Sequence, residues 1–69
     1  MIKNRLKQIR HELQIDTQVE MAQLVGVQRE QYHRYERQGQ QPTLELALRI
    51  AAKLNRPVEE IFYIIEPDE

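Results

Sequence analysis

The sequence contains no cysteine, serine or tryptophan, and it has only two glycines and one phenylalanine. The absence of cysteine excludes a disulfide framework and a thiolate zinc site. No apolar stretch approaches the length that crosses a membrane, and the charged residues that begin at Lys3 exclude an apolar signal core. These absences predict a cytoplasmic protein that makes no use of the membrane.

Groups suited to catalysis are equally scarce. Without cysteine or serine, the small hydroxyl nucleophiles are two threonines, and both Thr17 and Thr43 stand where helix caps are expected. The histidines, His11 and His33, lack a second ligand pair at a metal-binding spacing. A domain of 69 residues also leaves little room for a concave pocket. We therefore expect a protein that is not an enzyme and that needs no metal or cofactor.

The charges are distributed unevenly along the chain. Residues 57–69 carry five acids and no base, whereas residues 1–56 carry ten bases and six acids, a net charge of +4. A basic body with an acidic tail suits a nucleic-acid partner if the tail faces away from it. The acidic terminus is also consistent with a role in solubility alone. The length predicts one domain, residues 1–69, which is small enough to gain stability from oligomerisation.

Apolar residues recur at helical spacing in five segments. The first helix is expected from about Asn4, its N-cap, to Leu13, and two more lie within residues 17–36. The fourth, residues 44–54, is predicted to be the central core helix because of its apolar residues Leu44, Ala47, Leu48, Ile50, Ala51 and Leu54. A short fifth helix runs from Pro57 to about Ile61. The β-branched and aromatic residues at 62–65 favour a strand, which residues 1–3 can pair with. The fold class is therefore all-α with five helices and a small terminal antiparallel sheet.

Residues 17–36, TQVEMAQLVGVQREQYHRYE, contain two short amphipathic helices joined by a tight turn. Thr17 and Glu20 form a capping box, and Gly26 can adopt the left-handed conformation that ends a helix. Tyr32 and Tyr35 continue a buried face. The polar residues of the second helix point away from this buried face. A short helix held across another with its polar side free is the shape that fits a major groove.

This block resembles the helix-turn-helix of the Xre family, the Cro/CI-type repressors. The resemblance extends from Asn4 to Phe62 and includes Thr17-Gln18, Glu20-Met21-Ala22, Leu24-Val25-Gly26-Val27, Arg29, Tyr32, Tyr35-Glu36 and Pro42-Thr43-Leu44-Glu45. It implies a Cro/CI-type domain that binds double-stranded DNA as a transcriptional regulator, most simply a repressor. An antitoxin or a phage Cro-like switch protein is the alternative within DNA binding. A protein-interaction module on the same scaffold is the alternative of another class.

The resemblance also implies which side chains meet DNA. In the family, bases are read from the positions of Arg29, Glu30, His33 and Arg34. Arg29 can bond guanine O6 and N7, whereas Glu30 either accepts from cytosine N4 or pairs with Arg34. The DNA-backbone positions correspond to Thr17, Gln18, Gln28, Gln31, Arg37, Gln40 and Thr43. Arg10 and Glu36 match a structural salt bridge.

Two departures from the family pattern are expected to change loops. The segment Leu13-Gln14-Ile15-Asp16 lacks the usual glycine and is one residue longer, and Gln38-Gly39 shifts the glycine after the third helix. The apolar C-terminal segment, residues 57–66, predicts a homodimer with Val58, Ile61, Phe62 and Ile64 at its interface. Such a two-fold dimer requires a pseudo-palindromic operator.

Overall fold

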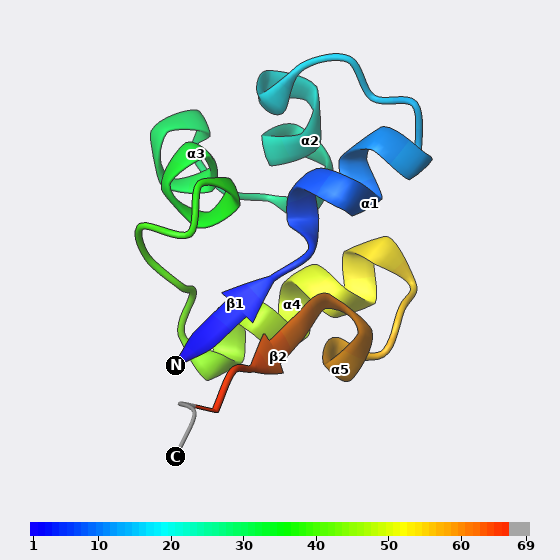
Figure 1. Cartoon of the computed structure of the whole chain (residues 1–69). Coiled ribbons are helices and arrows are strands. Elements are labelled where there is room, and N and C mark those ends of the chain that lie inside the picture. The colour runs from blue at the N-terminus through cyan, green and yellow to red at the C-terminus, as the bar shows by residue number, and fades with distance from the viewer. Residues whose placement is uncertain (67–69) are drawn as a thin grey trace.

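Five helices and a two-stranded antiparallel sheet make up the computed structural model, which describes residues 1–66 (Figure 1). In chain order the elements are β1 (Ile2–Asn4), α1 (Leu6–Glu12), α2 (Gln18–Val25), α3 (Arg29–Glu36), α4 (Leu44–Leu54), α5 (Val58–Ile61) and β2 (Phe62–Ile64). The predicted fold class is confirmed. In the described part of the chain, no helix is long and apolar enough to span a membrane.

The helices begin and end where local chemistry favours it. The Thr17 hydroxyl accepts a hydrogen bond from the Glu20 amide at 3.1 Å, which caps α2. Thr43 caps α4 in the same way through the amide of Leu46 at 3.3 Å. Gly26 follows α2 with φ 82°, a left-handed conformation that a residue without Cβ adopts at no steric cost.

The terminal sheet joins the two ends of the described chain. Ile2 pairs with Ile64, Lys3 with Tyr63 and Asn4 with Phe62. Figure 1 shows β1 and β2 side by side across the lower part of the molecule, beside α4 and α5. The predicted pairing of the N-terminal segment with the C-terminal strand is therefore confirmed, but β1 is displaced by one residue from the predicted 1–3, to Ile2–Asn4.

The core lies between α1, α2, α3 and α4. Tyr32 and Tyr35 are fully buried in it, as predicted, and the other buried apolar residues are Leu6, Ile9, Met21, Ala22, Val25, Ala47, Ile50, Ala51 and Ile61. Leu44 and Leu48, which were expected in the core, are exposed by 74% and 50%, and Leu13, at the end of α1, is exposed by 43%. Leu44 and Leu48 occupy a neighbouring ridge of α4, because Ala47, Ile50 and Ala51 already fill the face that meets the core.

Asn4 was predicted to be the N-cap of α1, and this prediction is wrong. Asn4 ends β1, and the N-cap position is occupied by the next residue, Arg5. The buried side chain of Asn4 still accepts from the amide of Leu6, the first residue of α1, at 3.1 Å, and it also connects β1 to the end of α3. The Asn4 side-chain amide donates to the Tyr35 carbonyl at 2.8 Å and to Gln41 Oε1 at 2.8 Å. The Gln38 side chain pairs with the Asn4 backbone, accepting from its N–H at 3.0 Å and donating to its carbonyl at 2.9 Å.

Both loops that were predicted to depart from the family pattern use a non-glycine residue with positive φ. Gln38 has φ 66° at the exit from α3, and Gln14 has φ 59° in the loop between α1 and α2. Each occupies a position with positive φ, where glycine would be favoured over a residue with a Cβ atom. For Gln38, the bonds to the Asn4 backbone offset this cost.

Candidate nucleic-acid interface

Helices α2 and α3 pack against each other, and Met21 and Val25 of α2 and Tyr32 of α3 are buried in the same core cluster. The exposed side of α3 is therefore polar. Five side chains of α3 and its C-cap, together with Gln18 at the start of α2, line one shallow hollow; the five are Arg29, Glu30, His33, Arg34 and Arg37. The structure thus brings the four predicted base-reading residues together with two predicted DNA-backbone residues.

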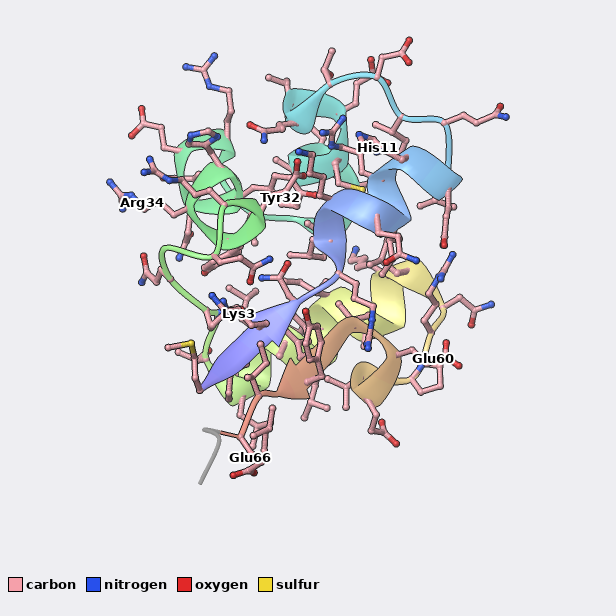
Figure 2. All side chains as sticks on the ribbon, viewed as in Figure 1. Lys3, His11, Tyr32, Arg34, Glu60 and Glu66 are labelled. Carbon is pink, nitrogen blue, oxygen red and sulfur yellow. The ribbon has the colours of Figure 1, made fainter. Side chains whose placement is uncertain are left out.

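The charge of this hollow is mainly positive. Three guanidinium groups, those of Arg29, Arg34 and Arg37, surround the single carboxylate of Glu30. Figure 2 shows Arg34 extending outward from α3, whereas Tyr32 points into the molecule. Within residues 1–66, Glu30 makes no ion pair with Arg34 within 4.0 Å, so the carboxylate stays free to interact with another group.

The other predicted DNA-backbone residues lie around the hollow and do not line it. Gln28 is the exposed N-cap of α3, and Gln31 is half-buried in its first turn. Gln40 is exposed in the loop that follows α3. Thr17 and Thr43 cap α2 and α4, so their hydroxyl oxygens already accept a hydrogen bond while the hydroxyl hydrogen remains available.

A buried ion pair lies directly behind the hollow. Arg10 of α1 donates from Nε to Glu36 Oε2 at 3.0 Å and from Nη2 to Glu36 Oε1 at 2.9 Å. The same guanidinium donates from Nη1 to the carbonyls of Ile15 and Asp16, at 3.2 and 3.3 Å. The pair therefore joins α1, α3 and the loop before α2. This bidentate geometry is the strong form of an arginine–carboxylate contact.

The pair and its neighbours have shifted pKa values. Burial raises the pKa of Glu36, but the hydrogen bonds from Arg10, with a smaller contribution from Gln18, outweigh it, so the pKa lies below its usual range. The hydrogen bond to Glu36 raises the pKa of Arg10. Burial, followed by the nearby Glu36 carboxylate, raises the pKa of Tyr32. Both members of the pair therefore stay charged, and Tyr32 stays neutral, around pH 7.

The sequence reasoning missed a hydrogen-bond relay from this ion pair to the surface of α3. Gln18 Nε2 donates to Glu36 Oε1 at 3.1 Å, and Gln18 Oε1 lies 2.8 Å from His33 Nδ1. No spacing rule relates Gln18 to His33, because the two residues come from different helices. The relay depends on the way in which α2 crosses α3 in the folded chain.

The predicted dimer residues divide into exposed and buried positions. Ile64 is 64% exposed, and Val58 and Phe62 are half-buried. Ile61 is fully buried within the chain, so its side chain cannot contact a partner, contrary to prediction. It faces inward and belongs to the same hydrophobic core cluster as Leu6 and Ile50.

A tight turn between two crossed helices, the second with a solvated, basic outer face, defines a DNA-binding transcription regulator of the helix-turn-helix class. The helix-turn-helix family model matches residues 6–61. The chain belongs to this family, in its Xre (Cro/CI) type. The family is one of DNA-binding regulatory domains rather than catalytic domains. A comparison with curated proteins finds no match.

Proposed function

We propose that this regulator is a homodimeric, sequence-specific repressor that binds a pseudo-palindromic operator in double-stranded DNA. The observation that carries the proposal is the exposed face of α3, where Arg29, His33 and Arg34 lie beside Gln18 and Arg37 without an apolar anchor. A protein partner would favour an aromatic or aliphatic anchor there, whereas a major groove favours solvated donors and acceptors. Repression follows most directly, because a protein seated on a promoter blocks the polymerase.

Within this proposal, the first turn of α3 supplies the strongest base contact. Arg29 bonds guanine O6 and N7, and Glu30 accepts from cytosine N4. Arg34 reads a base or a phosphate further along the helix. The start of α2, with Gln18, and the exit from α3, with Arg37, contact the DNA backbone. Their role is to set the register in which α3 reads the bases.

The distribution of charge supports this orientation. Figure 2 shows Glu60 and Glu66 on the side of the molecule remote from Arg34. These two acids therefore face away from the surface that would approach phosphate groups. This arrangement reconciles a net charge of −1 with DNA binding.

A second copy of the chain is the proposed occupant of the apolar surface at the terminal sheet. Ile2, Pro42, Leu44, Ala47, Val58 and Phe62 line an apolar groove there. Ile64 and Leu48, exposed by 64% and 50%, lie beyond that groove on β2 and α4. We therefore revise the interface: Leu44 and Leu48 join Val58, Phe62 and Ile64, and Ile61 leaves it. The two copies of α3 would lie about 34 Å apart, one turn of DNA.

Selection of bound DNA from a random pool tests the proposed function. A pseudo-palindrome should emerge, and its affinity should fall with salt in proportion to the number of phosphates contacted. Arg34→Ala should weaken binding, whereas Lys53→Ala, on the exposed last turn of α4, is the matched control. Recovery of no preferred sequence would overturn the proposal. Binding of a protein through α3 would favour the interaction-module alternative.

Sedimentation equilibrium at micromolar concentration tests the dimer. The wild-type chain should have twice the monomer mass, and Ile64→Asp should have the monomer mass. Leu13→Asp, 43% exposed at the end of α1, is the matched control and should remain dimeric. If the wild-type chain is a monomer in solution but still binds a palindrome, dimerisation occurs only on the DNA.

A further inference from the structure

His33 is the one predicted base-reading residue whose side chain is hydrogen-bonded to another helix. Its Nδ1 lies 2.8 Å from Gln18 Oε1, and Gln18 is half-buried at the start of α2. A neutral imidazole has one nitrogen that donates and one that accepts. The identity of the Gln18 atom that faces the ring therefore decides which nitrogen carries the hydrogen.

The ion pair behind Gln18 determines how its amide is oriented. Glu36 Oε1 lies 3.1 Å from the other end of the amide. An ionised carboxylate can only accept, and Arg10 keeps this one ionised. The amide must therefore present its NH₂ group to Glu36 and its carbonyl oxygen to His33. The reverse orientation would place two acceptors, Gln18 Oε1 and Glu36 Oε1, against each other and lose the bond to the ion pair.

The orientation of Gln18 in turn assigns the tautomer of His33. Because Gln18 Oε1 can only accept, Nδ1 must carry the hydrogen, and Nε2 of the neutral ring is left with a lone pair. Nε2 lies on the ring edge opposite Gln18. Among residues 1–66 it has no hydrogen-bond partner. The ring therefore presents an acceptor, and no donor, to whatever approaches α3.

We propose that the Arg10–Glu36–Gln18 relay holds His33 in its Nδ1–H tautomer, so that Nε2 reads an exocyclic amino group of the operator, adenine N6 or cytosine N4. In the major groove these two groups are the only donors, because guanine O6 and N7 and thymine O4 all accept. The inference rests on the proposed function, since it requires α3 to enter the major groove. Gln18 is a positioning residue in this scheme, and His33 is the specificity residue.

The charged groups around the ring set the conditions for a test. Arg29, Glu30, Arg34 and Arg37 of the α3 region line the same hollow, and Glu36 lies behind Gln18. A second proton on the imidazole would turn Nε2 into a donor and reverse the preference. Measurements therefore belong at mildly alkaline pH, where imidazoles are neutral.

The tautomer can be tested on the free protein by ¹⁵N correlation spectroscopy of the histidine rings. His33 should have a protonated Nδ1 and an unprotonated Nε2. His11, which is exposed and has no side-chain hydrogen bond within residues 1–66, is the internal reference and should show the Nε2–H form that free imidazoles favour. Gln18→Met, which matches the length of glutamine without its polar atoms, should move His33 toward the His11 pattern. An Nε2–H ring at His33 in the wild-type protein would overturn the inference.

The readout can be tested on the operator obtained by selection. His33→Ala should lose discrimination at one base pair of the operator. At that pair, the amino group can be removed by replacing adenine with purine or cytosine with pyrimidinone. Removing the amino group should lower the affinity of the wild-type protein about twofold to tenfold more than it lowers the affinity of His33→Ala. This range corresponds to one neutral hydrogen bond. A guanine analogue without N7 that weakens only the wild type would overturn the inference. Failure to select any operator would overturn the proposed function and leave the tautomer result standing.

Discussion

Replacing Glu36 with alanine should destabilise the domain strongly, because it leaves the Arg10 guanidinium buried without a counter-charge. The side chains of Arg10 and Glu36 are only 10% and 2% exposed. Arg10 would lose its two bonds to the carboxylate and keep only those to the carbonyls of Ile15 and Asp16. Gln18 would lose a bond as well.

The expected loss is about 3–5 kcal/mol in the free energy of unfolding, the cost of removing one partner of a buried ion pair. A chain of this length has a total stability of roughly 3–10 kcal/mol. The variant should therefore lie close to the unfolding threshold. Its urea midpoint should fall by about 2 M or more, with little change in the slope of the transition.

Two further variants isolate the cause. Glu45→Ala breaks the exposed pair between Glu45 and Arg49, whose side chains are 75% and 71% exposed, and should cost only about 0.3–0.5 kcal/mol. Arg10→Met combined with Glu36→Leu removes both charges and should recover most of the stability lost in Glu36→Ala. If Glu36→Ala cost no more than Glu45→Ala, the pair would contribute little and this reasoning would be wrong.

Three other outcomes are expected. Arg29→Ala should lower discrimination at one base pair by about 1–3 kcal/mol in competition binding and leave the unfolding curve unchanged; an equal loss on operator and random DNA would show a phosphate contact instead. Thr17→Ala should cost about 1 kcal/mol in urea unfolding while Thr17→Ser costs little, because only the hydroxyl caps α2. Because the pKa of Glu36 is lowered in the fold, its carboxylate contributes stability above pH 4.5, and this contribution is lost as the pH falls below that value. When the pH is lowered from 4.5, the urea midpoint should therefore decrease less steeply for Glu36→Gln than for the wild type.

Local signals in the sequence accounted for most of the fold. The caps at Thr17 and Thr43 and the left-handed turn at Gly26 depend on adjacent residues, and the structure has all three. The predictions for Leu44 and Leu48 were wrong because α4 has more apolar ridges than the core of one chain can cover. Periodicity identifies an apolar face but does not show whether that face meets the same chain.

The candidate site was predicted as a set of positions, without its hydrogen bonds. The family pattern placed Arg29, His33 and Gln18 near one another, and the structure gathers them around one hollow. The bond between Gln18 and His33 depends on the angle at which α2 crosses α3, and no residue pattern encodes that angle. The amide contacts of Gln38 with Asn4 were missed for another reason: they join residues 34 positions apart, beyond the reach of any local pattern.

The terminal sheet has a kinetic consequence. It pairs residues as far apart as Ile2 and Ile64, whereas the helices and their neighbours make contacts that are closer in sequence. Closing so long a loop costs chain entropy before its contacts form, so the sheet should assemble after the helices have packed. Contacts that form after the folding transition state govern how fast a protein unfolds and not how fast it folds. We therefore expect β1 and β2 to set the lifetime of the folded regulator, and α1 to α4 to set the speed at which it folds.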